Sequence, residues 1–228
     1  MQENPILQQL AARALESVGD GAIVGLGSGR AALAFVRALG EKVRGGLRIK
    51  GIPTSEETGR VALEYGIELI GLEDCDSIDV TIDGADEVDP NLDLIKGYGG
   101  ALVREKIVAA ASQREIILVG DEKLVPKLGA RGILPVEVIQ FAVAVCRKRL
   151  TALGCRPQVR QRDGKPFVSD GGNYILDCGV EPLPDPRRLD AAIREIPGVV
   201  GTGLFLGVAD LVLVGTKTEV REMVRPRP

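Results

Sequence analysis

Residues 79–106 carry the densest group of side chains able to do chemistry, in the segment DVTIDGADEVDPNLDLIKGYGGALVREK. An apolar run, IELIGL, precedes the segment, and another, EIILVG, follows it. Ionised side chains close to a buried core are costly unless they have partners or water. We therefore expect this segment to form a functional site rather than a part of the scaffold.

Carboxylates and lysines are the candidate proton carriers, because the chain contains no histidine. That absence excludes Ser-His-Asp triads, histidine-ligated metals and imidazole acid-base chemistry. The four cysteines lack C-x-x-C spacing, so we expect reduced thiols and no zinc site. They are Cys75, Cys146, Cys155 and Cys178.

Two aspartates and a lysine lie beside glycines in this segment. Asp83 and Asp86 follow the expected strand SIDVTID, and Gly84 permits a sharp turn that lets both carboxylates face one cavity. Lys96 precedes the turn Gly97-Tyr98-Gly99-Gly100, where the backbone is able to approach a ligand closely.

Glu105 is the candidate general base, on a helix expected from about Gly100 to Ser112. A carboxylate partly shielded from water is the best available group for removing a proton next to a carbonyl, and a lysine stabilises the resulting oxyanion. From the residues alone, a solvated helix position for Glu105 stays open. Arg104 and Lys106 are equally consistent with a charged face.

A glycine turn after the first expected strand, Ala22–Leu26, resembles an anion site. Unpaired backbone N–H groups and the dipole of the helix that follows both point at such a turn. The turn is neither G-x-G-x-x-G nor a P-loop, so a plain strand-to-helix connection remains the alternative. The residues are Gly27, Ser28, Gly29, Arg30 and Ala31.

A second polar turn precedes the helix expected from about Glu56 to Tyr65. Pro53-Thr54-Ser55 is typical of a helix N-cap, with Thr54 or Ser55 as the capping hydroxyl. A capping role alone is favoured over a ligand contact.

The order of the expected elements predicts the fold. Strands alternate with helices over the first 120 residues, which indicates an open, mostly parallel, Rossmann-like sheet. The pattern then changes, and residues 131–205 read as a smaller α+β domain with a hairpin turn at Arg162–Lys165. The closing run DLVLVGT predicts a buried strand of the main sheet. The predicted domains are therefore 1–130 with 206–228, and 131–205.

Two further helices are expected, at Pro5–Val18 and from about Val138 to Leu153.

The composition is that of an ordinary globular protein. The chain has 228 residues and a net charge of -3, so it lacks a bulk attraction to nucleic acid or to anionic membranes. The first residues lack the basic start and apolar core of a secretory signal, and no apolar run approaches the roughly 20 residues of a spanning helix. We expect a cytoplasmic protein.

Four separated segments, in this order, resemble the ribose-5-phosphate isomerase A family: IDGADE, KGYGGALVREK, LPVEVI and IPGVVGTGLF. The similarity runs from VGLGSG near the start to DLVLVGT near the end. The resemblance implies interconversion of ribose 5-phosphate and ribulose 5-phosphate through an enediolate, without metal or organic cofactor. It also implies helices on both faces of the Rossmann-like sheet, a ferredoxin-like small domain, and a homodimer or homotetramer.

The same resemblance implies roles for single residues. Glu105 would move the proton between C1 and C2, and Lys96 would stabilise the oxyanion. Asp83 and Asp86 would bind sugar hydroxyls and assist ring opening, and Lys123 in VGDEK would lie near the phosphate. The expected substrate- and phosphate-binding residues are Gly27, Ser28, Gly29, Arg30, Ala31, Gly97, Gly99, Gly100 and Lys123.

The chain departs from the family pattern at several points. The phosphate loop, usually G-T-G-S-T, keeps only its first hydroxyl, and Ile6, Leu7 and Gln8 stand where a lysine is common. The VGDEK segment is one residue short, and Tyr98 replaces a frequent glycine. We hypothesise that Arg30 grips the phosphate as a forked donor. A solvated arginine in the first helical turn is the alternative.

Two other classes of protein remain as alternatives. One is a non-catalytic sugar-phosphate-sensing module of a transcription regulator, although the chain has the full carboxylate and lysine set and no basic helix-turn-helix segment. The other is a different enzyme on a related fold, such as a CoA transferase or an aminosugar-phosphate deaminase. A deaminase would be expected to need a histidine.

Overall fold

The computed structural model describes residues 4–225, which form two compact units. The first unit contains residues 4–85, Arg104–Lys123 and 208–225, and the second contains Asp86–Val103 and Leu124–Gly207. The chain therefore passes repeatedly from one unit to the other.

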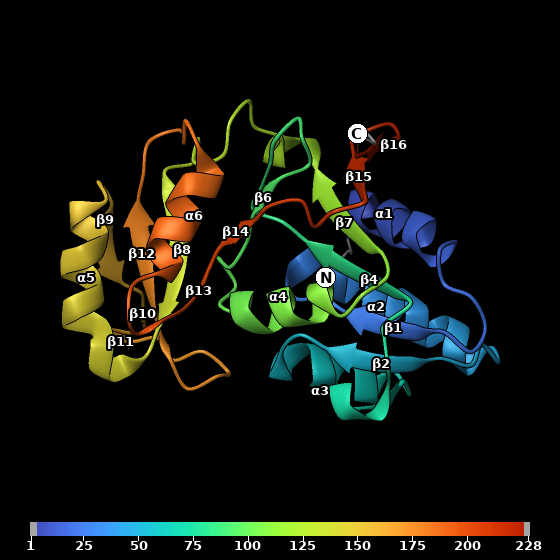
Figure 1. Cartoon of the computed structure of the whole chain (residues 1–228). Helices are drawn as coiled ribbons and strands as arrows, with labels where there is room; N and C mark the ends of the chain where they lie inside the picture. Colours follow the sequence, from blue (N-terminus) through green and yellow to red (C-terminus); the bar gives the residue numbers. More distant parts are fainter. Residues whose placement is uncertain (1–3, 226–228) are drawn as a thin grey trace. The chain divides into compact units, whose positions relative to one another are not determined.

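The first unit is built on a seven-stranded sheet in the order β16-β15-β7-β4-β1-β2-β3 (Figure 1). All neighbours are parallel except β16 (Val220–Val224), which is antiparallel to β15. Taken in chain order, the parallel strands follow the 3-2-1-4-5-6 arrangement of the Rossmann fold. The parallel strands are β1 (Ile23–Leu26), β2 (Lys50–Pro53), β3 (Glu68–Leu69), β4 (Val80–Gly84), β7 (Glu115–Gly120) and β15 (Leu211–Gly215). The predicted sheet and the return of the closing strand are confirmed.

Helices cover both faces of this sheet, as predicted. On one face, Leu10 and Phe35 share a core with Val24 of β1. Successive strand residues point to opposite faces, so Gly25 faces the other side, where a Cβ would lie 2.9 Å from Val108 of α4. The helices of this unit are α1 (Pro5–Leu15), α2 (Gly29–Arg44), α3 (Glu56–Glu64) and most of α4 (Leu102–Ala110).

The second unit contains a four-stranded antiparallel sheet in the order β13-β8-β12-β9. Its elements follow one another as β-α-β-β-α-β, which is the ferredoxin-like arrangement. They are β8 (Ile133–Val138), α5 (Val143–Ala152), β9 (Arg156–Val159), β12 (Tyr174–Gly179), α6 (Pro186–Arg194) and β13 (Val199–Thr202).

Two local predictions in this unit have different outcomes. The hairpin is confirmed, because β10 (Gln161–Arg162) pairs with β11 (Lys165–Pro166) across a turn with positive φ at Asp163 and Gly164. The helix expected from Val138 is wrong at its start, since Val138 ends the buried strand β8 and α5 begins only at Val143.

A three-stranded sheet completes the second unit, in the order β14 (Leu204–Phe205), β6 (Leu94–Ile95) and β5 (Glu87–Val88). The Glu87 carboxylate also accepts hydrogen bonds from the backbone N–H groups of Gly129 (2.6 Å) and Arg131 (2.7 Å). Residues 86–103 and 124–130 therefore group with the second unit, although the sequence places them in the first domain. The predicted domain boundaries stay a prediction, and residues 1–3 and 226–228 lie outside the described part of the chain.

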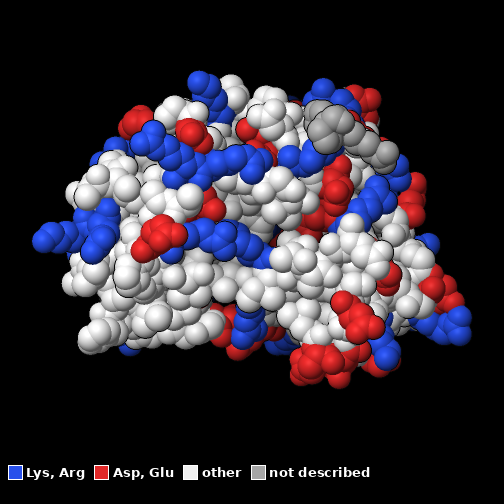
Figure 2. Space-filling view, viewed as in Figure 1, with Lys and Arg blue, Asp and Glu red and all other residues white. Residues whose placement is uncertain are grey.

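The surface carries both signs of charge. On the face drawn in Figure 2, Lys and Arg side chains are interspersed with Asp and Glu. Among residues 4–225, no helix combines the length and the apolar character needed to span a membrane.

Gly25 gives a test of the packing between α4 and the sheet. A Cβ at this position would lie 1.8 Å from the Thr81 hydroxyl oxygen. We expect Gly25→Ala to lower the free energy of unfolding by about 2 to 3 kcal/mol, because overpacking forces the helix away from the strand. Urea titration measures this, with Gly19→Ala as control because a Cβ on Gly19 would meet no neighbour within 4 Å. Equal stability of the two variants would contradict the described packing.

Candidate active site

Four predicted or neighbouring site positions meet at one edge of the seven-stranded sheet. Strands β7, β4, β1 and β2 are adjacent and parallel, so their carboxyl ends lie side by side. Lys123 follows β7 in a short 3-10 turn, Asp83 lies in β4, Ser28 follows β1 and Thr54 follows β2. The chain order reverses between β1 and β4, which is where sheets of this type bind their ligands.

Asp83 joins the two strands at this reversal. Its side chain is fully buried, and its Oδ1 accepts hydrogen bonds from the backbone N–H groups of Ser28 (3.0 Å) and Gly84 (2.7 Å). Gly27 is required here, since a Cβ would lie 2.3 Å from the same oxygen. Charge-assisted bonds of this kind are stronger than neutral ones. Asp83 therefore fixes the glycine turn against β4.

The hydroxyl of Ser28 belongs to a network that links two strand-to-helix turns. Its Oγ lies 2.7 Å from Thr54 Oγ1 and 2.8 Å from Ser55 Oγ. Thr58 Oγ1 accepts from Ser55 Oγ and donates to the Gly27 carbonyl (2.9 Å). Sequence reasoning missed Thr54 and Thr58 as neighbours of Ser28, although hydroxyls at the end of an adjacent strand were the available signal.

Ser55 has the capping role that the sequence predicts. It is the N-cap of α3, and its Oγ accepts from the Thr58 backbone N–H at 3.2 Å. Ser28 is the N-cap residue of α2 but makes no side-chain capping bond there. Its hydroxyl therefore bonds to the other hydroxyls of the network and does not cap the helix.

The rest of the predicted glycine turn forms the start of α2. Gly29 has a φ of +85°, a conformation that favours glycine, and Arg30 is exposed in the first helical turn. The 16-residue helix has no acidic residue in that turn. A contact of Arg30 with a phosphate stays a prediction.

Glu105 lies on the buried face of α4. It is 6% exposed and shares that face with Leu102, Val108 and Ala109, at helical spacing. This burial excludes the solvated position that the residues alone left open.

The direction of α4 places Glu105 towards the carboxyl edge of the sheet. At the end of the helix, the Ala111 carbonyl accepts from the backbone N–H of Ile78, just before β4. Glu105 lies about 9 Å back along the helix axis, at 1.5 Å per residue. The first unit thus brings Ser28, Asp83, Lys123 and the helix turn of Glu105 to the same edge.

In the second unit, Asp86 and Lys96 lie opposite each other at the open end of a hairpin. Glu87 of β5 pairs with Ile95 of β6, and the Asp86 N–H donates to the Ile95 carbonyl at 2.8 Å. Lys96 is 3% exposed, and its ammonium lies 5.4 Å from the centre of the Phe205 ring. A cation over a ring face is attracted by the π electrons. The hairpin therefore joins two residues that are ten positions apart.

The glycine turn after Lys96 is tied to Asp86. Gly97 and Gly100 have φ of +105° and +96°, and the Gly100 N–H donates to the Gly97 carbonyl at 3.0 Å. The Tyr98 backbone N–H donates to Asp86 Oδ2 at 2.9 Å. Burial, with the nearby Glu87 and Asp86 carboxylates, raises the pKa of the Tyr98 phenol above its usual value. Its hydroxyl therefore remains a donor, directed to the Ile133 carbonyl at 3.3 Å.

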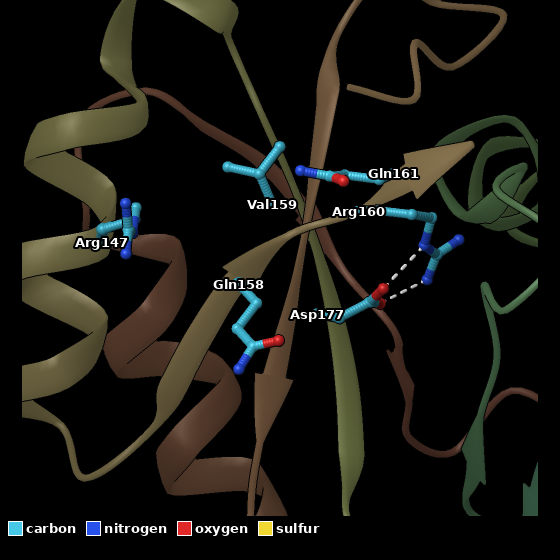
Figure 3. A pocket seen from close by; sticks show the side chains of 6 residues that line it. All are labelled: Arg147, Gln158, Val159, Arg160, Gln161 and Asp177. Atoms are coloured by element: carbon cyan, nitrogen blue, oxygen red, sulfur yellow. Dashed lines mark hydrogen bonds and ion pairs between the residues drawn. The ribbon is translucent and has the colours of Figure 1, made fainter. Parts of the chain in front are cut away.

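A separate cavity of about 640 Å³ lies in the second unit (Figure 3). Its lining contains none of the residues predicted for the site. The lining residues are Arg147, Gln158, Val159, Arg160, Gln161 and Asp177.

The strand order defines a Rossmann-type α/β protein, and its described residues bury Asp83, Glu105 and Lys96. Residues 50–219 match the family described as Ribose 5-phosphate isomerase A (phosphoriboisomerase A). The chain belongs to this family.

Relatives match almost the entire chain. Ribose-5-phosphate isomerase A of Gloeobacter violaceus is 54% identical over 92% of both chains. The protein of the same name from Thermomicrobium roseum is 51% identical over 96% of this chain and 94% of its own.

Solved structures agree with the fold. Ribose 5-phosphate isomerase A of Methanocaldococcus jannaschii has a TM-score of 0.92 at 39% identity, covering 96% of this chain and 98% of its own. A D-ribose-5-phosphate isomerase in complex with phospho-erythronic acid has a TM-score of 0.94 at 37% identity, covering 99% and 100%.

Thr54 tests the hydroxyl network. Its side chain is fully buried, and its Oγ1 donates to the Leu26 carbonyl at 3.1 Å besides its bond with Ser28. Thr54→Val preserves the shape but leaves both partners short of a bond, so we expect a loss of about 1 to 3 kcal/mol in the free energy of unfolding. Urea titration measures it, and the exposed Thr218→Val is the control. A loss no larger than that of the control would contradict a structural role for the network.

Proposed function

We propose that this protein interconverts D-ribose 5-phosphate and D-ribulose 5-phosphate, the isomerisation of the non-oxidative pentose phosphate pathway, through an enediolate. Its substrate is thus a small sugar phosphate. Membership of the isomerase family over nearly the full chain supports the reaction. The related enzyme in complex with phospho-erythronic acid supports the substrate class, since a sugar-acid phosphate combines a phosphate with a negative charge at the opposite end.

The burial of Glu105 is the observation that carries the mechanism. In the proposed reaction, Glu105 removes the proton from C2 of the open-chain aldose, which leaves an enediolate with its charge on O1. The same carboxyl then returns the proton to C1, while the O2 hydroxyl proton passes to O1 as the ketone forms at C2. At 6% exposure, water has little access to the carboxyl, which favours transfer between the two carbons over exchange with solvent.

Lys96, Asp83 and Asp86 act on the oxygens of the sugar in this proposal. The buried Lys96 ammonium stabilises the enediolate charge, because an ion pair is strong where water is excluded. Asp83 and Asp86 accept hydrogen bonds from sugar hydroxyls and assist ring opening. The backbone bonds to both carboxylates hold them in place before substrate binds.

The phosphate is assigned to the start of α2. Backbone N–H groups at a helix N-terminus, the Ser28 hydroxyl and the Arg30 guanidinium are all donors to an anion. Lys123 at the end of β7 adds a positive charge at the same sheet edge. The proposed substrate-binding set is Gly27, Ser28, Gly29, Arg30, Ala31, Gly97, Gly99, Gly100 and Lys123.

The assembly and location of the enzyme stay predictions. We propose a cytoplasmic homodimer or homotetramer that needs no metal or organic cofactor. Sedimentation of the purified protein measures its oligomeric state, and turnover in the presence of a chelator tests whether it needs a metal.

The activity itself is tested by incubation with ribose 5-phosphate and a chelator, with ketose formation followed over time. We expect ribulose 5-phosphate to form. A protein that binds the sugar phosphate without converting it would instead support a sensing module, and release of ammonia from an aminosugar phosphate would support a deaminase.

Glu105→Gln tests the base. We expect a normally folded protein whose kcat falls by about 10² to 10⁴, because an amide cannot accept the C2 proton. Glu57→Gln is the matched control, since Glu57 is an exposed glutamate in the first turn of α3. Near-normal turnover of Glu105→Gln would refute the assignment.

Arg30→Ala tests the phosphate grip. We expect KM for ribose 5-phosphate to rise about tenfold with kcat little changed, as for the loss of one charge-assisted hydrogen bond. Arg37→Ala, two turns further along α2, is the control. If KM is the same in both variants, Arg30 does not bind the phosphate.

A further inference from the structure

In the second unit, Arg160 forms an ion pair with Asp177 through two hydrogen bonds (Figure 3). Arg160 Nε lies 2.9 Å from Asp177 Oδ2, and Nη2 lies 2.5 Å from Oδ1. The side chains are only 13% and 27% exposed. A bidentate pair of this kind fixes the plane of the guanidinium group.

The remaining guanidinium nitrogen is directed at the glycine turn after Lys96. Arg160 Nη1 donates to the Gly97 carbonyl at 2.8 Å and to the Tyr98 carbonyl at 3.0 Å. Because Asp177 fixes the guanidinium plane, it also fixes the position of Nη1. Two consecutive carbonyls of the turn are therefore held by one side chain, which lies 63 residues further along the chain, between β9 and β10.

The Gly97–Tyr98 peptide connects Arg160 to Asp86. In a trans peptide, the carbonyl and the N–H point in opposite directions. The Gly97 carbonyl accepts from Arg160, and the Tyr98 N–H of the same peptide donates to Asp86 Oδ2 at 2.9 Å. A rotation of the peptide away from Arg160 would thus withdraw the N–H from the Asp86 carboxylate.

The far end of the turn is held as well. A Cβ on Gly100 would lie 2.5 Å from the Phe167 ring, so the turn rests directly on that ring. The Phe167 N–H donates to the Arg160 carbonyl at 2.9 Å, and the Arg160 guanidinium lies 6.0 Å from the ring centre. Arg160 therefore also locates the surface that supports Gly100.

We propose that Arg160, held by Asp177, is a positioning residue for the reaction. It fixes the Gly97–Tyr98 peptide, and through that peptide it orients the Asp86 carboxylate beside Lys96. Arg160 does not itself touch the substrate. The inference rests on the proposed function, in which Asp86 binds and opens the sugar.

The test compares variants by steady-state kinetics with ribose 5-phosphate. Arg160→Lys retains a positive charge but lacks the planar fork, so we expect kcat to fall about tenfold, as for a small misplacement of a reacting group. Asp177→Asn keeps the shape of the side chain at 177 but removes the charge that holds the Arg160 guanidinium. We expect a similar fall in kcat. Arg156→Lys is the matched control, because Arg156, in β9, forms an exposed pair with Glu181. Its kcat should stay within about twofold of wild type.

A double-mutant cycle separates positioning from general destabilisation. Added to Asp86→Asn, Arg160→Lys should lower kcat by less than about twofold, because the carboxylate through which it acts is already lost. Two results would overturn the inference while leaving the isomerase function intact. One is a kcat of the double variant that falls by the full product of the two single losses. The other is wild-type kcat in both Arg160→Lys and Asp177→Asn. If Arg160→Lys does not fold, the cycle is run with Asp177→Asn. A wild-type protein that forms no ketose would overturn both proposals.

Discussion

The bonds between Asp83 and the backbone of the glycine turn are the interaction on which the first unit's site depends. One carboxylate oxygen accepts the N–H groups of Ser28 and Gly84, and so locks the ends of β1 and β4 together at the reversal of strand order. The hydroxyl network and the start of α2 take their positions from that lock. Gly27 permits it, since any side chain there would occupy the space of the carboxylate.

In the second unit, a hairpin brings two predicted site residues together. Asp86 and Lys96 meet because β5 and β6 pair, and the glycine turn that follows is held by Arg160, which directly follows β9 of the ferredoxin-like sheet. The segment that follows β9 in this isomerase thus helps to hold the glycine turn after Lys96. Predicted site residues also lie close to the places where the chain passes from one unit to the other, at 85–86, 103–104 and 123–124.

Long apolar patterns made the main sheet predictable. The strands at 23–26, 115–120 and 211–215 are buried runs followed by clear turns. Strand β8 was not separated from the helix after it, because a continuous apolar run has no period that distinguishes a buried strand. The two-residue strands β5, β6 and β14 are too short to show any pattern and exist through distant pairing. In the site, residue types indicated Glu105, but only packing decides its burial, and Arg160 carries no local signal at all.

The hydroxyl network at Ser28 has the property of a relay whose protons can be redistributed. Ser28 donates to Ser55, Ser55 to Thr58, and Thr58 to a carbonyl, while either Ser28 or Thr54 can be the donor in their shared bond. Hydroxyl hydrogens rotate freely about their C–O bonds. When Thr54 turns its single hydroxyl proton from the Leu26 carbonyl to Ser28, the Ser28 proton is able to turn towards a ligand with no movement of heavy atoms. The hydroxyls are therefore ordered in advance, so a ligand bound there would cost little conformational entropy.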